Sequence, residues 1–205
     1  MRLRVKSLAV LLISLFSFLA PADLLADTQT FNAMFFKPAI GRNFYLMLDG
    51  TQTLKQLQFD VGEVFSFGYH PLQIVQGNTR TAGVIDALLV SDFVASIGAL
   101  DWLQFGVDMP VVLLNRFSDP QATPQPPMKN YFDIGDLRLE AKARVLDSCK
   151  GYIGLAFIPF VTLPTGKSEH YVGDSGLTGG LKIALDGRVH PNLNLTFNVG
   201  YQGGR

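Results

Sequence analysis

Hydrophobic residues recur at every second position over most of the chain, the period of a β-strand with one apolar face. Between residues 136 and 145, Leu, Ala and Val take every odd position and charged residues every even one. No segment after residue 26 has the pattern of a long amphipathic helix. We expect eight strands, at 44–48, 57–69, 85–97, 103–113, 136–145, 153–163, 177–185 and 193–201, with room for a short ninth at 31–36.

The connections between these strands alternate in length. Short ones lie at 50–54, 98–102, 147–151 and 187–192, and long ones at 71–83, 115–133 and 166–176. Outer-membrane barrels have short periplasmic turns at one end and long external loops at the other. Aromatic residues stand near the strand ends, as in interfacial belts: Tyr69, Trp102, Tyr152 and Tyr201. The pattern predicts an all-β fold, an antiparallel up-and-down transmembrane β-barrel of about eight to nine strands over residues 27–205.

The N-terminal region has the three parts of a secretory signal peptide. Arg2, Arg4 and Lys6 precede an apolar run from residue 8 to 20, which is shorter than the roughly 20 residues that span a bilayer. We expect residues 1–26 to be the signal, with Ala22 as a second cleavage site, and the protein to reach the bacterial outer membrane. The alternative, a buried N-terminal helix, leaves the three cations unexplained.

Charge and cysteine content exclude several classes of protein. Only 17% of residues are charged, against about 25% in soluble domains, and 17 basic residues balance 17 acidic ones. Nucleic-acid binding, which needs a basic surface, is therefore not expected. The single cysteine, Cys149, forms neither an intramolecular disulfide nor a cysteine metal cluster, and no base partner marks it as a nucleophile.

One strand carries an uninterrupted series of charges on one side: Asp136, Arg138, Glu140, Lys142 and Arg144. This face should not contact lipid, because placing an Arg or Lys side chain toward the lipid at the bilayer midplane destabilises a barrel by about 2–4 kcal/mol. We therefore expect these residues to line the barrel interior together with Asp108, facing Gln104 and Gly106 on the preceding strand. A porin-like channel for small solutes is one interpretation. The alternating signs and the narrow cross-section favour the other, an interior filled by paired acids and bases in a structural, envelope-anchoring barrel.

Catalytic and metal-binding motifs are incomplete. Residues 165–168 end like a phosphate-binding loop, but Val161 occupies the position of its first glycine. Three histidines lie in separate connections, without zinc-site spacing: His70, His170 and His190. The adjacent residues 168–170, Ser-Glu-His, do not make a triad, which requires convergence in space. The sequence predicts no enzyme, no catalytic residue, no metal and no cofactor.

A secreted soluble β-sandwich or lipocalin-like binding domain is the competing interpretation. Alternation alone does not separate it from a membrane barrel. The signal, the loop lengths and the charged face together favour the barrel, whose partner would be outer-membrane lipid. Pro110 and Pro159 lie within expected strands and should mark an edge or a bulge, because proline cannot donate to a central ladder.

A series of short motifs follows a characteristic order: Phe31-Asn32-Ala33, Phe36-Lys37-Pro38-Ala39, Arg42-Asn43-Phe44, residues 103–113, Gly135-Asp136-Leu137-Arg138-Leu139, Pro159–Gly166, Thr178-Gly179-Gly180 and Asn198-Val199-Gly200-Tyr201. This series resembles the barrel region of OmpA-family outer-membrane proteins of Gram-negative bacteria. The resemblance implies a barrel followed by calcium-binding repeats and a peptidoglycan-binding domain. The sequence contains neither, so we expect a barrel truncated at its C-terminus, and peptidoglycan binding is assigned to no residue.

Overall fold

The computed structural model describes residues 32–41, 44–76, 79–117, 132–148, 152–190 and 193–204. The expected signal peptide and Cys149 lie outside these ranges. Within them, no helix is long and apolar enough to cross a membrane.

The described ranges fold mainly into β-strands. They are β1 (Phe44–Tyr45), β2 (Leu48–Asp49), β3 (Phe59–Gln76), β4 (Thr79–Leu100), β5 (Leu103–Phe117), β6 (Asp133–Ile134), β7 (Leu137–Leu146), β8 (Ile153–Leu163), β9 (Thr178–His190) and β10 (Leu193–Gly204). One 3-10 turn, η1 (Ser168–His170), lies between β8 and β9.

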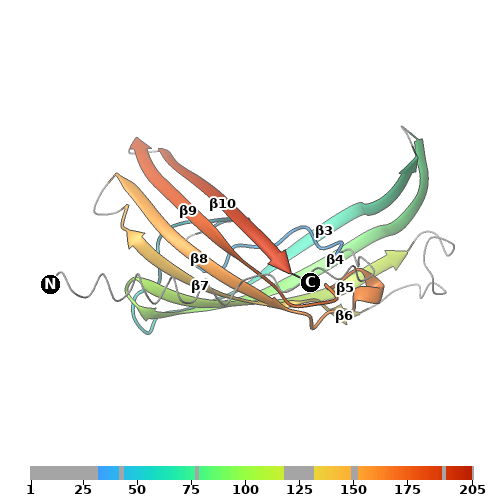
Figure 1. The fold of residues 1–205 in the computed structure, drawn as a ribbon, viewed down its shortest axis with the longest axis horizontal. Coiled ribbons are helices and arrows are strands. Elements are labelled where there is room, and N and C mark those ends of the chain that lie inside the picture. Colours follow the sequence, from blue (N-terminus) through green and yellow to red (C-terminus); the bar gives the residue numbers. More distant parts are fainter. Residues whose placement is uncertain are drawn as a thin grey trace.

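Seven long strands form one antiparallel sheet in the order β10-β9-β8-β7-β5-β4-β3, and the short β6 pairs with β5. The sheet curls into a half-barrel, with β3 and β4 on one side and β8 to β10 on the other (Figure 1). Both edge strands, β3 and β10, run in the same direction, because five antiparallel strands lie between them. The predicted all-β, incomplete antiparallel barrel is confirmed.

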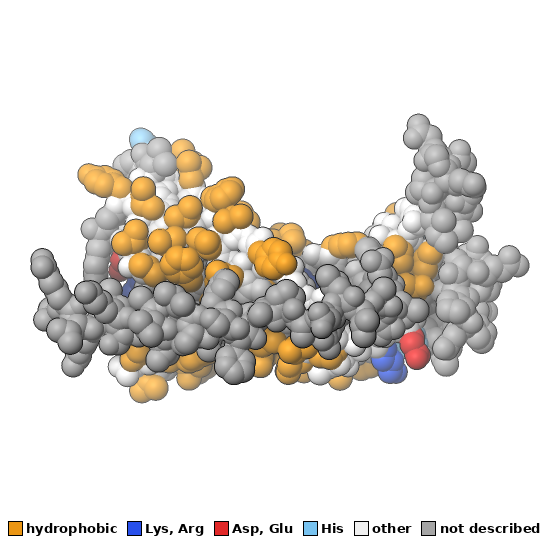
Figure 2. Space-filling view, viewed as in Figure 1, with side chains coloured by type: hydrophobic (Ala, Val, Ile, Leu, Met, Phe, Trp, Pro, Cys, Tyr) orange, Lys and Arg blue, Asp and Glu red, His pale blue; other side chains and the backbone are white. Residues whose placement is uncertain are grey.

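The two-residue alternation separates the two faces of the sheet. On β3, the odd residues from Phe59 to Tyr69 are exposed, and the hydrophobic ones among them are 61–77% exposed. On β4, the residues of opposite parity from Val90 to Gly98 are buried on the concave side. Many outward hydrophobic side chains are exposed, and Figure 2 shows them gathered over β8 to β10.

The prediction of a long loop at 71–83 is wrong. β3 and β4 continue as a hairpin to Gln76 and Thr79, through register shifts near Leu72. Pro71 is tolerated because β3 is an edge strand, where a missing N–H is no loss. His70 adopts a left-handed backbone conformation with φ of 48° beside this shift. Of the other expected connections, the turn at 98–102 and the long loop at 166–176 are confirmed.

Pro110 and Pro159 lie neither on an edge strand nor at a bulge. Pro110 sits where pairing of β5 with β7 has ended at Asp108 and pairing with β6 begins at Val111. Pro159 sits opposite a gap in the β7–β8 ladder between Phe157 and Phe160. Each proline therefore occupies an interruption of a ladder, which removes the need for its N–H.

The N-terminal segment, residues 32–58, is not part of the wall. The expected strand at 44–48 is instead a separate hairpin of β1 and β2, and residues 32–36 form no strand. The connection expected at 50–54 therefore joins no two wall strands. This segment runs through the trough of the half-barrel (Figure 1), where β2 contacts β10.

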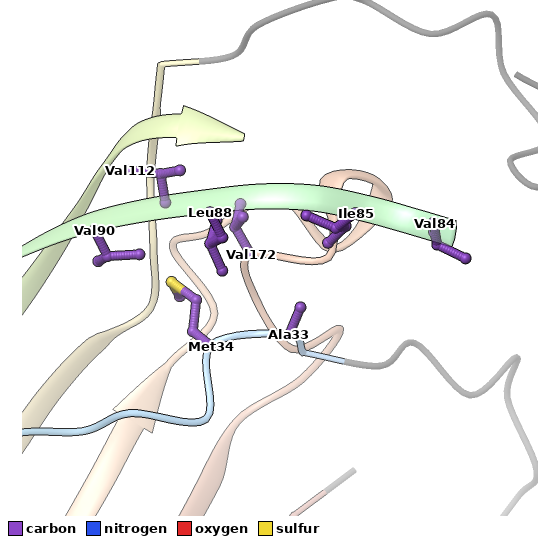
Figure 3. Close-up of a cluster of buried hydrophobic side chains, with 8 residues drawn as sticks. All are labelled: Ala33, Met34, Val84, Ile85, Leu88, Val90, Val112 and Val172. Carbon is purple, nitrogen blue, oxygen red and sulfur yellow. The ribbon is translucent and has the colours of Figure 1, made fainter. Parts of the chain in front are cut away.

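A hydrophobic cluster closes the end of the trough that carries the 166–176 loop (Figure 3). Its members come from the N-terminal segment, β4, β5 and that loop: Ala33, Met34, Val84, Ile85, Leu88, Val90, Val112 and Val172. The backbone N–H of Ala33 donates to the carbonyl of Tyr171 at 2.8 Å, so the loop is fastened to the segment beneath it.

Gly98 lets the end of the N-terminal segment lie against β4. A Cβ added there would stand 2.1 Å from the carbonyl oxygen of Lys55, a backbone atom that cannot turn away. We expect Gly98→Ala to lower the free energy of unfolding by about 1–3 kcal/mol and to open residues 52–58 to limited proteolysis. Gly68→Ala is the control, since its Cβ would meet Pro71 at an ordinary 3.4 Å. Equal proteolysis of both variants would contradict this account.

Candidate functional site

The concave face of the half-barrel carries a row of charged side chains beside buried apolar ones such as Val94 and Ile158, and it is almost closed to solvent. The register of β5 against β7 sets Asp108 opposite Arg138, Gly106 opposite Glu140 and Gln104 opposite Lys142. Of the six residues expected to line the interior, five are only 2–6% exposed: Asp108, Asp136, Arg138, Glu140 and Lys142. The sixth, Arg144, is half-buried near the end of the half-barrel where the 98–102 turn lies, which we call the turn end.

Asp49 of β2 is the centre of the ion-pair network. Its carboxylate is completely buried and lies 3.0 Å from the Lys142 Nζ through Oδ1 and 2.6 Å from the Lys182 Nζ through Oδ2. Lys182 Nζ also lies 3.2 Å from Glu140 Oε2. Burial alone raises the pKa of the Asp49 carboxyl, but the two lysine ammonium groups outweigh it, and the pKa lies below its ordinary value. The N-terminal segment thus neutralises cations of β7 and β9.

The backbone of Asp49 is held by the last strand. Its N–H donates to Oδ1 of Asn198 at 2.7 Å, and Nδ2 of Asn198 donates to its carbonyl at 2.9 Å. The N–H of Thr51 donates to Oδ2 of Asp186 on β9 at 2.9 Å. Together with Lys142 of β7, these residues show that three wall strands bind residues 49–51.

Arg138 and Gln104 of the wall hold further residues of the N-terminal segment on both sides of Asp49. Arg138 pairs with Asp108 at 3.1 Å, and its Nη2 also donates to the carbonyl of Pro38. Gln104 accepts the N–H of Leu54 at 3.0 Å and donates to the carbonyl of Ile40 at 3.4 Å. These bonds satisfy backbone groups that would otherwise be buried without partners.

Arg144 joins the segment to the turn end. Its Nη1 donates to Oε1 of Gln52 at 2.8 Å and its Nη2 to the carbonyl of Asp101 at 2.7 Å. Nε2 of Gln52 donates in turn to Oγ of Ser148 at 2.9 Å. Six described residues of the segment, at positions 38, 40, 49, 51, 52 and 54, are therefore bonded to the wall along the trough.

At the opposite end, acidic residues fix the 166–176 loop. Asp136 accepts the N–H groups of Gly166 at 2.9 Å and Asp174 at 2.7 Å. Burial raises the pKa of the Asp136 carboxyl above its ordinary value, and the two N–H donors offset this only in part. Asp133 pairs with His170 Nδ1 at 2.6 Å and with Lys167 at 3.1 Å.

A small cavity remains between the segment and the wall. Its polar lining includes Lys37, Asp92, Asp108, Asp136 and Arg138. Asp92 and Asp108 are each 2% exposed, and each has one carboxylate oxygen without a hydrogen bond among the described residues. With Asp136, three buried carboxylates therefore line this cavity.

The other candidate residues do not converge on one site. His70 pairs with Asp86 at 3.0 Å on the β3–β4 hairpin, His170 lies in the loop and His190 is exposed at the end of β9. Ser168 and His170 share the turn η1. In the described ranges, no three His, Cys, Asp or Glu side chains come together in a way that could hold a metal ion.

Sequence reasoning missed the residues that complete the network. Lys182 stands in an alternating stretch, between Leu181 and Ile183, and the two-residue period alone places it on the inner face. Asp49 carries no such signal, because it lies in a two-residue strand that belongs to no wall ladder.

Comparison with known protein families, with curated proteins and with solved structures finds no match for this chain.

Replacing Asp49 with Asn leaves the ammonium groups of Lys142 and Lys182 without a shared counter-charge. Removing one partner of a buried pair costs about 3–5 kcal/mol, and we expect a loss in this range in denaturant unfolding followed by the fluorescence of Trp102. Asp60→Asn on β3 is the matched control, because no ion pair within the described residues involves its carboxylate. An Asp49→Asn loss no larger than that of the control would refute the role of Asp49.

The lowered pKa of Asp49 makes its contribution depend on pH. Since the folded pKa lies below the ordinary value of 3.8, the stabilisation is complete above that value and is lost as pH falls through the folded pKa. The difference in unfolding free energy between the native chain and Asp49→Asn should therefore shrink below about pH 4. A difference that stays constant from pH 7 to pH 2 would contradict this.

Proposed function

We propose that this chain is a β-barrel part of a bacterial outer-membrane protein, in which the interior is closed by the chain's own N-terminal segment and the role is structural. The distribution of side chains over the two faces carries the proposal. The inner face holds buried ion pairs, and the outer face holds exposed Leu, Phe, Val and Ile. A soluble β-sandwich would bury those apolar rows and turn the charges outward.

The dimensions of the outer face support this assignment. The row from Phe59 to Tyr69 spans ten residue steps, about 33 Å along the strand. At the tilt of about 40° usual in outer-membrane barrels, it would cover about 25 Å, the height of their apolar band. Trp102 and Tyr152 are exposed at the turn end, and Tyr69 and Tyr201 toward the loop end, as aromatic girdles require.

The filled trough favours a structural role over the porin-like channel. Asp49, Lys142 and Lys182 occupy the middle of the trough, and the segment from Pro38 to Leu54 is bonded to the wall on several sides. The sequence resemblance to OmpA-family barrels agrees with an envelope role. Contact with peptidoglycan would need a further domain and is assigned to no residue.

Fractionation of cells that express the full chain tests the proposal. We expect the protein to sediment with outer membranes and to remain there after an alkaline wash, while a soluble periplasmic protein is removed. Recovery in the soluble periplasmic fraction would refute a membrane barrel and favour the secreted binding domain. In planar bilayers we expect negligible conductance; stepwise conductance that changes in Arg138→Gln would support the porin-like channel instead.

A further inference from the structure

Asp92 of β4 is a buried carboxylate without a counter-charge. It is 2% exposed, and its Oδ2 has no hydrogen-bond partner. Among the described residues, no ion pair involves this side chain. A carboxylate withdrawn from water is costly unless an opposite charge accompanies it. Asp92 therefore needs a partner that the neighbouring side chains do not supply.

Asp108 of β5 brings a second free oxygen to the same place. The register sets Asp108 opposite Val94, two residues from Asp92, so the two carboxyl groups are diagonal neighbours on the inner face. Both side chains line the small cavity. Oδ2 of Asp108 pairs with Arg138 at 3.1 Å, but Oδ1 has no hydrogen-bond partner. Two buried carboxylate oxygens from adjacent strands are therefore available to one occupant.

The lining of this cavity carries one more negative charge than positive charges. Its acidic side chains are Asp92, Asp108 and Asp136, and its basic ones are Lys37 and Arg138. Arg138 is paired with Asp108, whereas Lys37 makes no ion pair within the part of the chain that the structure describes. Asp136 uses both oxygens to accept backbone N–H groups of the 166–176 loop. One positive charge is therefore missing beside Asp92 and Asp108.

The cavity has room for one small particle. Its volume is about 10 Å³, close to the least that holds a water molecule. A divalent ion such as Mg²⁺, which keeps several of its waters, does not fit this space. A water molecule fits but brings no charge. A bare alkali cation fits the space and also supplies the missing charge.

We propose that Asp92 and Asp108 bind one alkali cation, sodium or potassium, in this cavity. Its protein ligands are Oδ2 of Asp92 and Oδ1 of Asp108. The N-terminal segment lines the same cavity with Asn32, Met34 and Lys37, so the bound cation stabilises the contact between this segment and the wall. The site lies on the inner face and does not depend on what covers the outer face of the sheet.

Thermal unfolding of the full chain in detergent, at constant ionic strength and neutral pH, tests the site. We expect sodium or potassium chloride to raise the melting temperature saturably by about 2–4 °C over choline chloride, whose cation is too large for the cavity. The salt that gives the larger shift identifies the preferred ion.

Asp92→Asn should lose this response to alkali salts. In choline chloride it should unfold at no lower temperature than the native chain, because the substitution removes an unmatched buried charge. Asp60→Asn is the matched control and should keep the response of the native chain.

Equilibrium dialysis with radioactive sodium, or with rubidium in place of potassium, gives a second measurement that needs no variant. We expect saturable binding of a single ion per native chain. Equal melting temperatures in the three salts, no saturable binding, or an equal response in Asp92→Asn would each overturn the cation site and leave the proposed function standing. Recovery of the chain in the soluble fraction overturns the membrane barrel alone, and the same measurements then apply without detergent.

Discussion

A charged group that leaves water must meet an opposite charge, and this constraint organises the interior of the half-barrel. Lys142 and Lys182 project from wall strands into a trough from which solvent is almost excluded, and among the described ion pairs only Lys182 has an acidic partner on the wall, Glu140. Asp49 supplies the missing negative charge from inside the trough. The N-terminal segment is therefore as much a part of the interior as the strands that surround it.

The same constraint explains why the two faces of the sheet differ so sharply. The polar groups of the wall are turned inward, where backbone carbonyls of Pro38 and Ile40 and the carboxylate of Asp49 can satisfy them. The outer face keeps rows of apolar side chains that find no partner within the described chain. Large exposed apolar patches of this kind mark contacts with another protein or with a membrane.

The wall strands could be predicted from sequence because their period is local. The alternation in 136–145 or 193–201 needs no knowledge of other residues, and it also assigns Arg138, Glu140 and Lys142 to one face. The extension of β3 and β4 past Pro71 could not be predicted, because proline is acceptable there only on an edge strand, and edges are a property of the whole sheet. The place of the N-terminal segment was missed for a related reason: Asp49 is fixed by Lys182 and Asn198, which lie 133 and 149 residues away.

Those separations bear on how the chain acquires its fold. Contacts between residues far apart in sequence must close long loops and form slowly compared with local hairpins. Residues 32–58 emerge before the wall strands during synthesis, yet their contacts with the wall are complete only when β10 has formed and Asn198 is in place. Residues 32–58 can therefore bind the wall completely only after β10 has formed. Until then, Lys142 of β7 and Lys182 of β9 remain in contact with water, because the trough above them is still open.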